Sequence, residues 1–190
     1  MRARFPTRAW RRLRGDQRGV AAIEFALVVP VMIVIYLVGF EVTEAATAYR
    51  KLTDTTVQVA NVTAQFTSMS CTDITNVLDA TAQIMTPYPT SNIDIVLSEV
   101  TTNSAGVGKV TWSEELQGTR LPDGSTVTMP TGFQTPNSSY VMVRTSYIYQ
   151  PSIGAAFIGP IQMTDKIFML PRASSSIPET GTNPSPPCTT

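Results

Sequence analysis

Glu24 places a carboxylate near the start of the apolar run from Val20 to Phe40, and it is the only charged residue of that run. A carboxylate costs on the order of 2–3 kcal/mol at the centre of a membrane-spanning helix and less near an end. Glu24 is therefore a candidate for a function, and the chemistry open to it is pairing with a cation. An ordinary membrane anchor that contains an accidental glutamate is the competing interpretation.

The chain offers few other groups for catalysis or metal binding. It contains no histidine and two cysteines, Cys71 and Cys188. This composition excludes most zinc sites and every nucleophile that depends on histidine. The neighbouring carboxylates Glu114 and Glu115 are expected to form a solvated strand end rather than an acid–base pair. We therefore predict a protein that is not an enzyme, with no catalytic residues, no metal site, no cofactor and no small-molecule substrate.

The two cysteines can also form a disulfide. In an oxidising compartment, pairing of Cys71 with Cys188 within one chain is the simplest arrangement, and it would close a long loop. Two unpaired thiols and a bridge between two chains are the alternatives.

Positive charge gathers before the apolar run. Residues 1–19 contain seven arginines and one acidic residue, whereas acidic residues outnumber basic ones in the rest of the chain. A nucleic acid is therefore not expected as a partner.

The apolar run has the length of a membrane span. At 1.5 Å per residue it extends about 30 Å, the thickness of the hydrocarbon core of a bilayer, so membrane lipid is an expected partner. The positive-inside rule then places residues 1–19 in the cytoplasm and everything after about residue 42 outside it. A cleaved secretory signal, with its site at residues 46–48, is the alternative.

The residues around Glu24 resemble a known family. Gly19 followed by "VAAIEF" resembles the processing site of type IV pilin-like proteins. The wider stretch "RGVAAIEFALVVPVMIVIYLVGFEVTEAATAYRKLT" is similar to the N-terminus of TadE-like pseudopilins, in the Tad (Flp) branch. The later stretch "VRTSYIYQPSIGAAFIGPIQMTDKIFMLPR" resembles the closing block of the same family. Together these likenesses cover residues 15–66 and 140–172.

The resemblance implies a processing and assembly site. A prepilin peptidase would cleave between Gly19 and Val20, which makes Glu24 the fifth and Phe25 the sixth residue of the mature chain. Val20 would then carry a new ammonium group one helical turn from Glu24. In a filament, the carboxylate of one subunit could pair with the amine of its neighbour and so set the register. A small residue at a helix start is the simpler account of Gly19.

The resemblance also implies a function and a location. It indicates a minor pilin or pseudopilin of a Tad pilus that primes or tips assembly for surface attachment. The expected partners are the prepilin peptidase, other Tad pilins and pseudopilins, and the assembly platform of the bacterial inner membrane. The protein would cross that membrane once, with the C-terminal domain in the periplasm and possible incorporation into the extracellular pilus. The alternative is a membrane-tethered periplasmic interaction domain that never enters a filament.

Periodicity predicts the elements that carry these groups. Apolar residues at spacings of three, four and seven predict one helix from Val20 to about Met69, whose second half is amphipathic. A second helix is expected from Thr72 to about Met85, started by a Thr or Asp cap and ended by the prolines that follow. Alternating patterns then predict strands in "NIDIVLSEV", "GKVTWSEEL", "SYVMVRTSYIY" and "IQMTDKIFMLP", with a short edge strand in "DGSTVTMP".

These elements predict an α+β fold: the long helix and a second helix packed on an antiparallel sheet of four or five strands. The expected organisation is a basic, cleaved leader (1–19), a transmembrane helix (20–40), an extracytoplasmic pilin-like domain (41–172) and a flexible tail rich in Ser, Thr and Pro (173–190).

Overall fold

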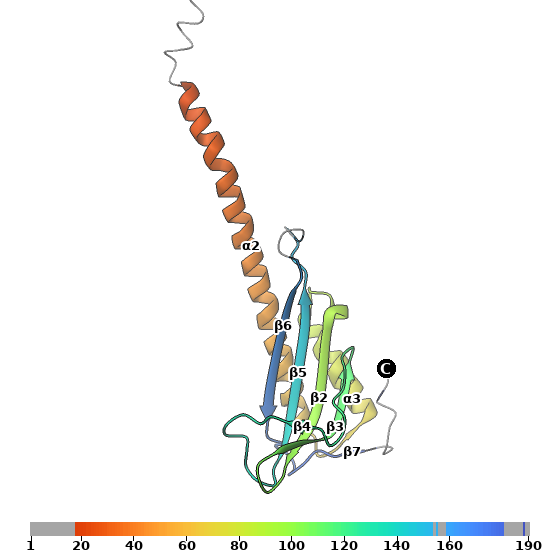
Figure 1. Cartoon of the computed structure of the whole chain (residues 1–190). Helices are drawn as coiled ribbons and strands as arrows, with labels where there is room; N and C mark the ends of the chain where they lie inside the picture. The colour runs from red at the N-terminus through yellow and green to blue at the C-terminus, as the bar shows by residue number, and fades with distance from the viewer. Residues whose placement is uncertain (1–17, 154, 156–158, 181–187, 189–190) are drawn as a thin grey trace, which may run out of the picture. The chain divides into compact units, whose positions relative to one another are not determined.

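The computed structural model describes residues 18–153, 155, 159–180 and 188 (Figure 1). The expected leader therefore lies outside the described residues except for Arg18 and Gly19. By its internal contacts the chain divides into two units, Met1–Thr43 and Glu44–Thr190.

The described part of the first unit is the beginning of helix α2 (Arg18–Thr63), which continues through Pro30. Large apolar side chains cover this part of the helix and are exposed, with 71% of Phe25 and 72% of Tyr36 accessible. Among the described helices, α2 is the one that is long and apolar enough to cross a membrane. This agrees with the expected span in length and composition.

The later part of α2 belongs to the second unit and carries the predicted amphipathic stripe. Its side chains Ala48, Leu52 and Val59 are fully buried in the main hydrophobic core. The helix ends at Thr63, earlier than the expected Met69. Met69 instead lies in the two-residue strand β1 (Met69–Ser70), where its N–H donates to the carbonyl of Pro178. Pairing with a distant part of the chain therefore overrides the helical period here.

The second helix, α3 (Cys71–Ala82), begins with a different cap from the one expected. Ser70 is the N-cap, and its Oγ accepts from the N–H of Asp73 while the Asp73 carboxylate accepts from the N–H of Ser70. This reciprocal pair is a capping box. A 3₁₀ turn, η1 (Gln83–Met85), continues the helix to the predicted end at Met85.

Within the described residues, five strands form one antiparallel sheet in the order β4-β3-β2-β5-β6. The bounds are β2 (Ile93–Thr102), β3 (Gly108–Leu116), β4 (Thr126–Val127), β5 (Ser139–Tyr149) and β6 (Ile161–Met169). The four long strands and the short edge strand occupy the predicted segments. The α+β fold class is confirmed.

The two faces of the sheet contribute to two separate hydrophobic cores. Ile95 and Leu97 of β2 face α2 and α3 and join the main core. On the opposite face, Tyr140 and Met142 of β5 join a second, smaller core, which the segment 117–138 covers with Met129. Side chains alternate between faces along a strand, so one strand serves both cores.

The described part of the tail contacts the domain, contrary to the flexible tail expected over 173–190. Strand β7 (Glu179–Thr180) pairs in parallel with β1, and the side chain of Ile177 is fully buried. The indole Nε1–H of Trp112 donates to the carbonyl of Ile177 over 2.8 Å. Composition did not reveal these contacts because their partners are remote in the sequence. Residues 181–187, 189 and 190 lie outside the described residues.

Candidate functional site

The residues of the expected processing and assembly site all lie in the first turns of α2. Gly19, Val20, Glu24 and Phe25 are exposed, so their side chains are open to a partner from outside the chain. Val20 and Glu24 are four residues apart in one helix and share a face. Glu24 makes no hydrogen bond or ion pair with another described residue. The expected pairing with a neighbouring subunit therefore has no competing internal partner in the described structure.

Gly19 has no packing role in the described structure. A Cβ added at Gly19 would meet nothing within 4 Å, and the same is true of Gly39 farther along the helix. A side chain at either position therefore fits the described fold. The small size of residue 19 is therefore not a requirement of packing within the described structure.

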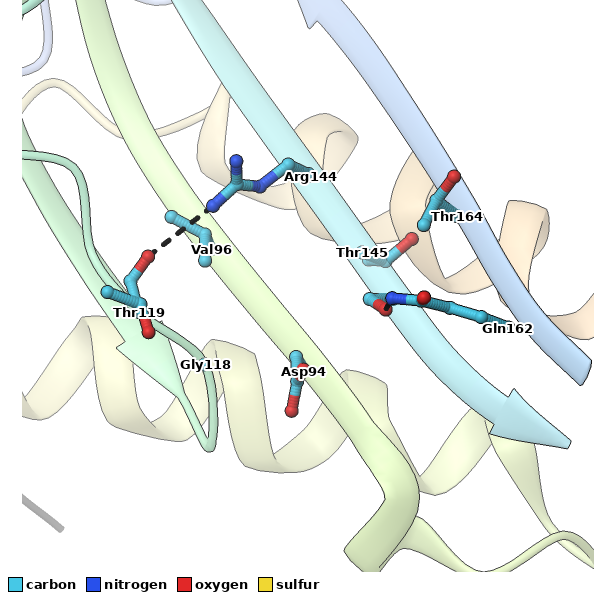
Figure 2. Close-up of a pocket in the computed structure, with 9 residues that line it drawn as sticks. Asp94, Val96, Gly118, Thr119, Arg144, Thr145, Gln162 and Thr164 are labelled. Atoms are coloured by element: carbon cyan, nitrogen blue, oxygen red, sulfur yellow. Dashed lines mark hydrogen bonds between the residues drawn. The ribbon is translucent and has the colours of Figure 1, made fainter. Parts of the chain in front are cut away.

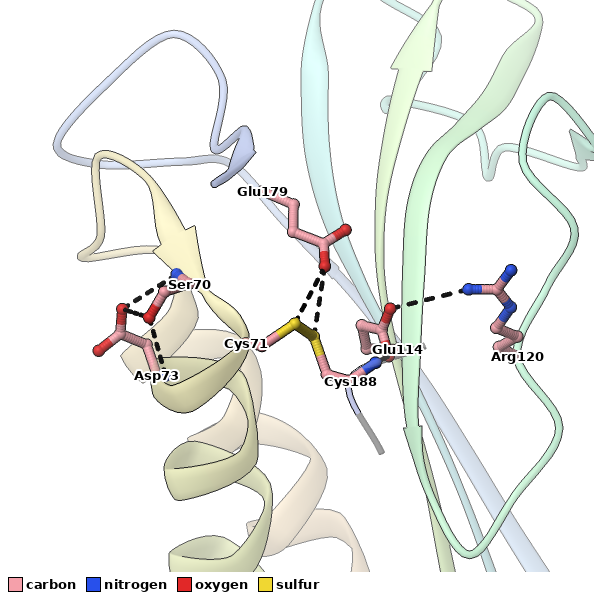
Figure 3. Close-up of a disulfide and its surroundings, with 7 residues drawn as sticks. All are labelled: Ser70, Cys71, Asp73, Glu114, Arg120, Glu179 and Cys188. Carbon is pink, nitrogen blue, oxygen red and sulfur yellow. Dashed lines mark hydrogen bonds and ion pairs between the residues drawn. A yellow bond between two sulfur atoms is a disulfide. The ribbon is translucent and has the colours of Figure 1, made fainter. Parts of the chain in front are cut away.

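A second group of chemical interest surrounds the two cysteines (Figure 3). Cys71, the first residue of α3, forms a disulfide with Cys188, and the two Cα atoms are 5.1 Å apart. Glu179 Oε1 lies 3.3 Å from Cys188 Sγ and 3.7 Å from Cys71 Sγ. Glu114 Oε2 accepts the N–H of Cys188 over 2.8 Å. The disulfide thus joins α3 to the end of the chain beside two carboxylates.

These sulfur and carboxylate atoms do not form a reactive centre or a metal site while the disulfide is intact. Cys71, Glu179 and Cys188 are close enough to share an ion, but both sulfurs are bonded to each other. Metals bind thiolates, which a disulfide does not offer.

Glu114 is buried, contrary to the expectation that it belongs to a solvated strand end. Only 3% of Glu114 is exposed, and Arg120 lies 3.8 Å away from its carboxylate. Burial raises the pKa of Glu114 above its ordinary value of 4.5, opposed in part by the hydrogen bond from Cys188. Burial likewise raises the pKa of Glu179. The expectation failed because Cys188, whose N–H contacts the Glu114 carboxylate, is remote from it in the sequence.

Comparison with known proteins bears on the N-terminal part of the chain. Residues 19–61 match the family model described as TadE-like protein. This segment is TadE-like. It contains Gly19, Val20, Glu24 and Phe25, so the resemblance drawn from these residues is confirmed. No curated protein and no solved structure matches the chain.

The TadE-like segment indicates a protein associated with the Tad pilus and with a membrane. The segment ends within α2, so α3, the sheet and the disulfide lie outside the match. Gly19, Val20, Glu24 and Phe25 therefore lie in the TadE-like segment, and the two carboxylates beside the disulfide lie in the rest of the domain.

A buried acid in the domain that follows the TadE-like segment was not predicted from the sequence. Glu99 is 2% exposed and its Oε1 accepts from Ser139 Oγ over 2.6 Å and from the N–H of Ile177 over 2.8 Å. In the sequence, Glu99 follows Ile95 and Leu97 at a period of two, so alternation places it on the buried face, but a charged residue type is not expected there. The β-bulge between Glu99 and Val100 accompanies this inward placement.

Proposed function

We propose that this protein is a minor pilin, or pseudopilin, of a Tad pilus, and that it primes or tips the pilus for surface attachment. The observation that carries the proposal is the TadE-like match over a helix whose apolar surface bears the exposed carboxylate of Glu24. The role is structural rather than catalytic. Its partners are the prepilin peptidase, other Tad pilins and pseudopilins, and the assembly platform.

The proposed location is the bacterial inner membrane. The start of α2 spans it once, because residues 20–40 have the length of the hydrocarbon core. The arginines of residues 1–19 keep the leader in the cytoplasm, and the domain after residue 41 lies in the periplasm. Cleavage between Gly19 and Val20 then removes the leader and leaves a mature chain that can enter a filament.

Glu24 sets the register between subunits. In lipid or in a filament core, the carboxylate is poorly solvated, so pairing with the Val20 ammonium of a neighbour is screened less than in water. A subunit docked out of register would leave a buried charge unpaired, which costs several kcal/mol. Phe25, which is 71% exposed, offers the adjoining apolar contact.

The size of the domain favours a minor subunit over a shaft subunit. The resemblance implies very short shaft pilins in this branch, whereas this chain continues from Glu44 into a folded unit with a sheet. A folded domain of this size suits a position in the pilus that a single subunit occupies.

N-terminal sequencing of the protein extracted from cells with a working pilus machinery tests processing. The expected first residue is Val20. Gly19→Leu should leave the leader attached, and Gly39→Leu is the matched control because both glycines have open space around them. A leader retained by the unmodified chain would contradict the proposal and favour the tethered domain that never enters a filament.

Immunoblotting of sheared pili and membranes tests assembly. Glu24→Ala should remain in the membrane fraction but disappear from the pili, because its neighbour's ammonium loses its partner. Val28→Ala, one turn along and also exposed, is the control for loss of side-chain volume and should assemble normally. Normal incorporation of Glu24→Ala would refute the register role.

A further inference from the structure

A polar groove lies on the sheet face opposite α2 and α3 (Figure 2). Its volume is about 290 Å³. Asp94 of β2, Arg144 of β5 and Gln162 of β6 contribute to its lining, and Thr119 of the segment after β3 forms one wall. The volume is at the lower end of the range for small-molecule sites.

The sheet register creates the groove where the second core ends. Along β5, the side chains on this face change from Tyr140 and Met142, which are buried in the second core, to Arg144 and Ser146. The segment that forms this wall approaches strand β2 closely because residue 118 is glycine. A Cβ there would lie 3.2 Å from Cγ2 of Val96. This half of the face is therefore polar and recessed rather than apolar and covered.

The polar groups in the groove are available to a ligand. The Arg144 side chain extends above Val96 toward Thr119, and its long 3.4 Å hydrogen bond to the Thr119 carbonyl leaves most of the guanidinium donors free (Figure 2). The carboxylate of Asp94 makes no hydrogen bond or ion pair with another described residue. Gln162 and Ser146 are joined by a 3.4 Å hydrogen bond and offer both donors and acceptors.

The composition of the groove limits the class of ligand. Val96 is the one apolar side chain among the described residues that line it, which disfavours a lipid or an aromatic compound. An arginine fork binds a carboxylate through two parallel hydrogen bonds. The Asp94 carboxylate would repel a dianion such as phosphate, but it accepts hydrogen bonds from hydroxyl groups.

We infer that this groove binds an acidic sugar unit, with its carboxylate on Arg144 and its hydroxyl groups on Asp94, Ser146 and Gln162. A hexuronate combines one negative charge with several hydroxyls in a volume that the groove can hold. The inference does not depend on the pilus proposal, because binding is a property of the isolated protein. Either can fail without the other.

The test is saturation-transfer NMR on the full chain in phosphatidylcholine nanodiscs, with D-glucuronate as the probe. We expect saturation transfer to D-glucuronate and weaker transfer to D-glucose, which lacks the carboxylate. Arg144→Gln should weaken D-glucuronate binding roughly tenfold or more, as loss of a charged hydrogen bond does. Trigalacturonate that competes more strongly than D-galacturonate, its monomer, would assign the source to a polysaccharide, and equal competition would assign it to the free sugar.

Lys166→Gln is the matched control. Lys166 pairs with Arg144 across β5 and β6 on the same face, but it does not line the groove. Its removal should change D-glucuronate affinity less than twofold. An equal loss in both variants, unchanged binding in Arg144→Gln, equal competition by glycine, or no saturation transfer at all would overturn the assignment.

Discussion

The N–H of Cys188 donates a hydrogen bond to the buried carboxylate of Glu114, with the two heavy atoms 2.8 Å apart. The disulfide joins the same residue to Cys71 at the start of α3. Cys188 therefore links strand β3 to helix α3, two elements that are far from it in the sequence. The stability of the second unit should depend on this junction.

Loss of the disulfide should destabilise the domain substantially. The bond spans a sequence separation of 117 residues. Closing a loop of that length is worth about 4–5 kcal/mol on the chain-entropy model. Urea unfolding of Cys71→Ser/Cys188→Ser in nanodiscs, followed by tryptophan fluorescence, measures the loss. Reductant should destabilise the unmodified chain and leave the double variant unchanged. A difference below about 1 kcal/mol between the two chains would contradict this expectation.

Glu99→Ala should lower the free energy of unfolding by about 2–4 kcal/mol, because it leaves the buried Ser139 hydroxyl and the N–H of Ile177 without an acceptor. Chemical denaturation measures the change. Glu99→Gln is the control: both hydrogen bonds end on Oε1, and an amide oxygen at that place can still accept both, so the loss should be smaller. Equal losses in the two variants would show that the acceptor is unimportant.

The hydroxyl pair that joins α2 to β5 should show energetic coupling. Thr56 Oγ1 donates to the carbonyl of Leu52, so in the 2.6 Å contact between hydroxyls the donor is Thr145. Thr145→Val should cost about 1 kcal/mol. In a double-mutant cycle with Thr56→Val, measured by denaturation, the double variant should lose less than the two single variants together. Additive losses would mean that the contact contributes nothing.

Stability should fall as the pH rises above about 4.5, because burial raises the pKa of both Glu114 and Glu179 in the folded state from an ordinary value of 4.5. The folded chain then binds these protons more tightly than the unfolded chain, so folding is favoured at low pH and weakened as the pH rises through the raised pKa values. Glu179→Gln should flatten this dependence in thermal unfolding measured between pH 4 and pH 7.

Asp73→Asn serves as the control of opposite sign. Hydrogen bonds from Ser70 lower the pKa of Asp73, so its contribution is present at neutral pH and is lost as the pH falls through the lowered pKa. This variant should not change the slope between pH 4 and pH 7. If Glu179→Gln kept the full slope of the unmodified chain, burial of Glu179 would not be its source.

Local patterns were sufficient for the elements and for the TadE-like segment. The stripe through Leu52 and Val59 predicted the packed face of α2, and the alternation in residues 93–102 and 139–149 predicted β2 and β5. These predictions succeeded because a helix and a strand repeat with fixed periods of 3.6 and 2 residues, so burial of one face is written into neighbouring positions. Glu24 could also be found from the local sequence, because it is the one charged residue in an apolar run.

The end of α2, the ordering of residues 177–180, the burial of Glu114 and the polar groove required the tertiary structure. In each case residues far apart in the sequence come together: Met69 bonds to Pro178, Glu114 accepts from Cys188, and Asp94 and Arg144 line one groove from the neighbouring strands β2 and β5. For the cysteines, the sequence left three arrangements open, and the structure contains the bond within one chain. Residue types and local spacing thus determined the elements and the membrane-length helix, whereas the folded chain alone decided which remote groups meet, because contact between them follows from sheet register and from the long-range pairing of residues 179, 180 and 188.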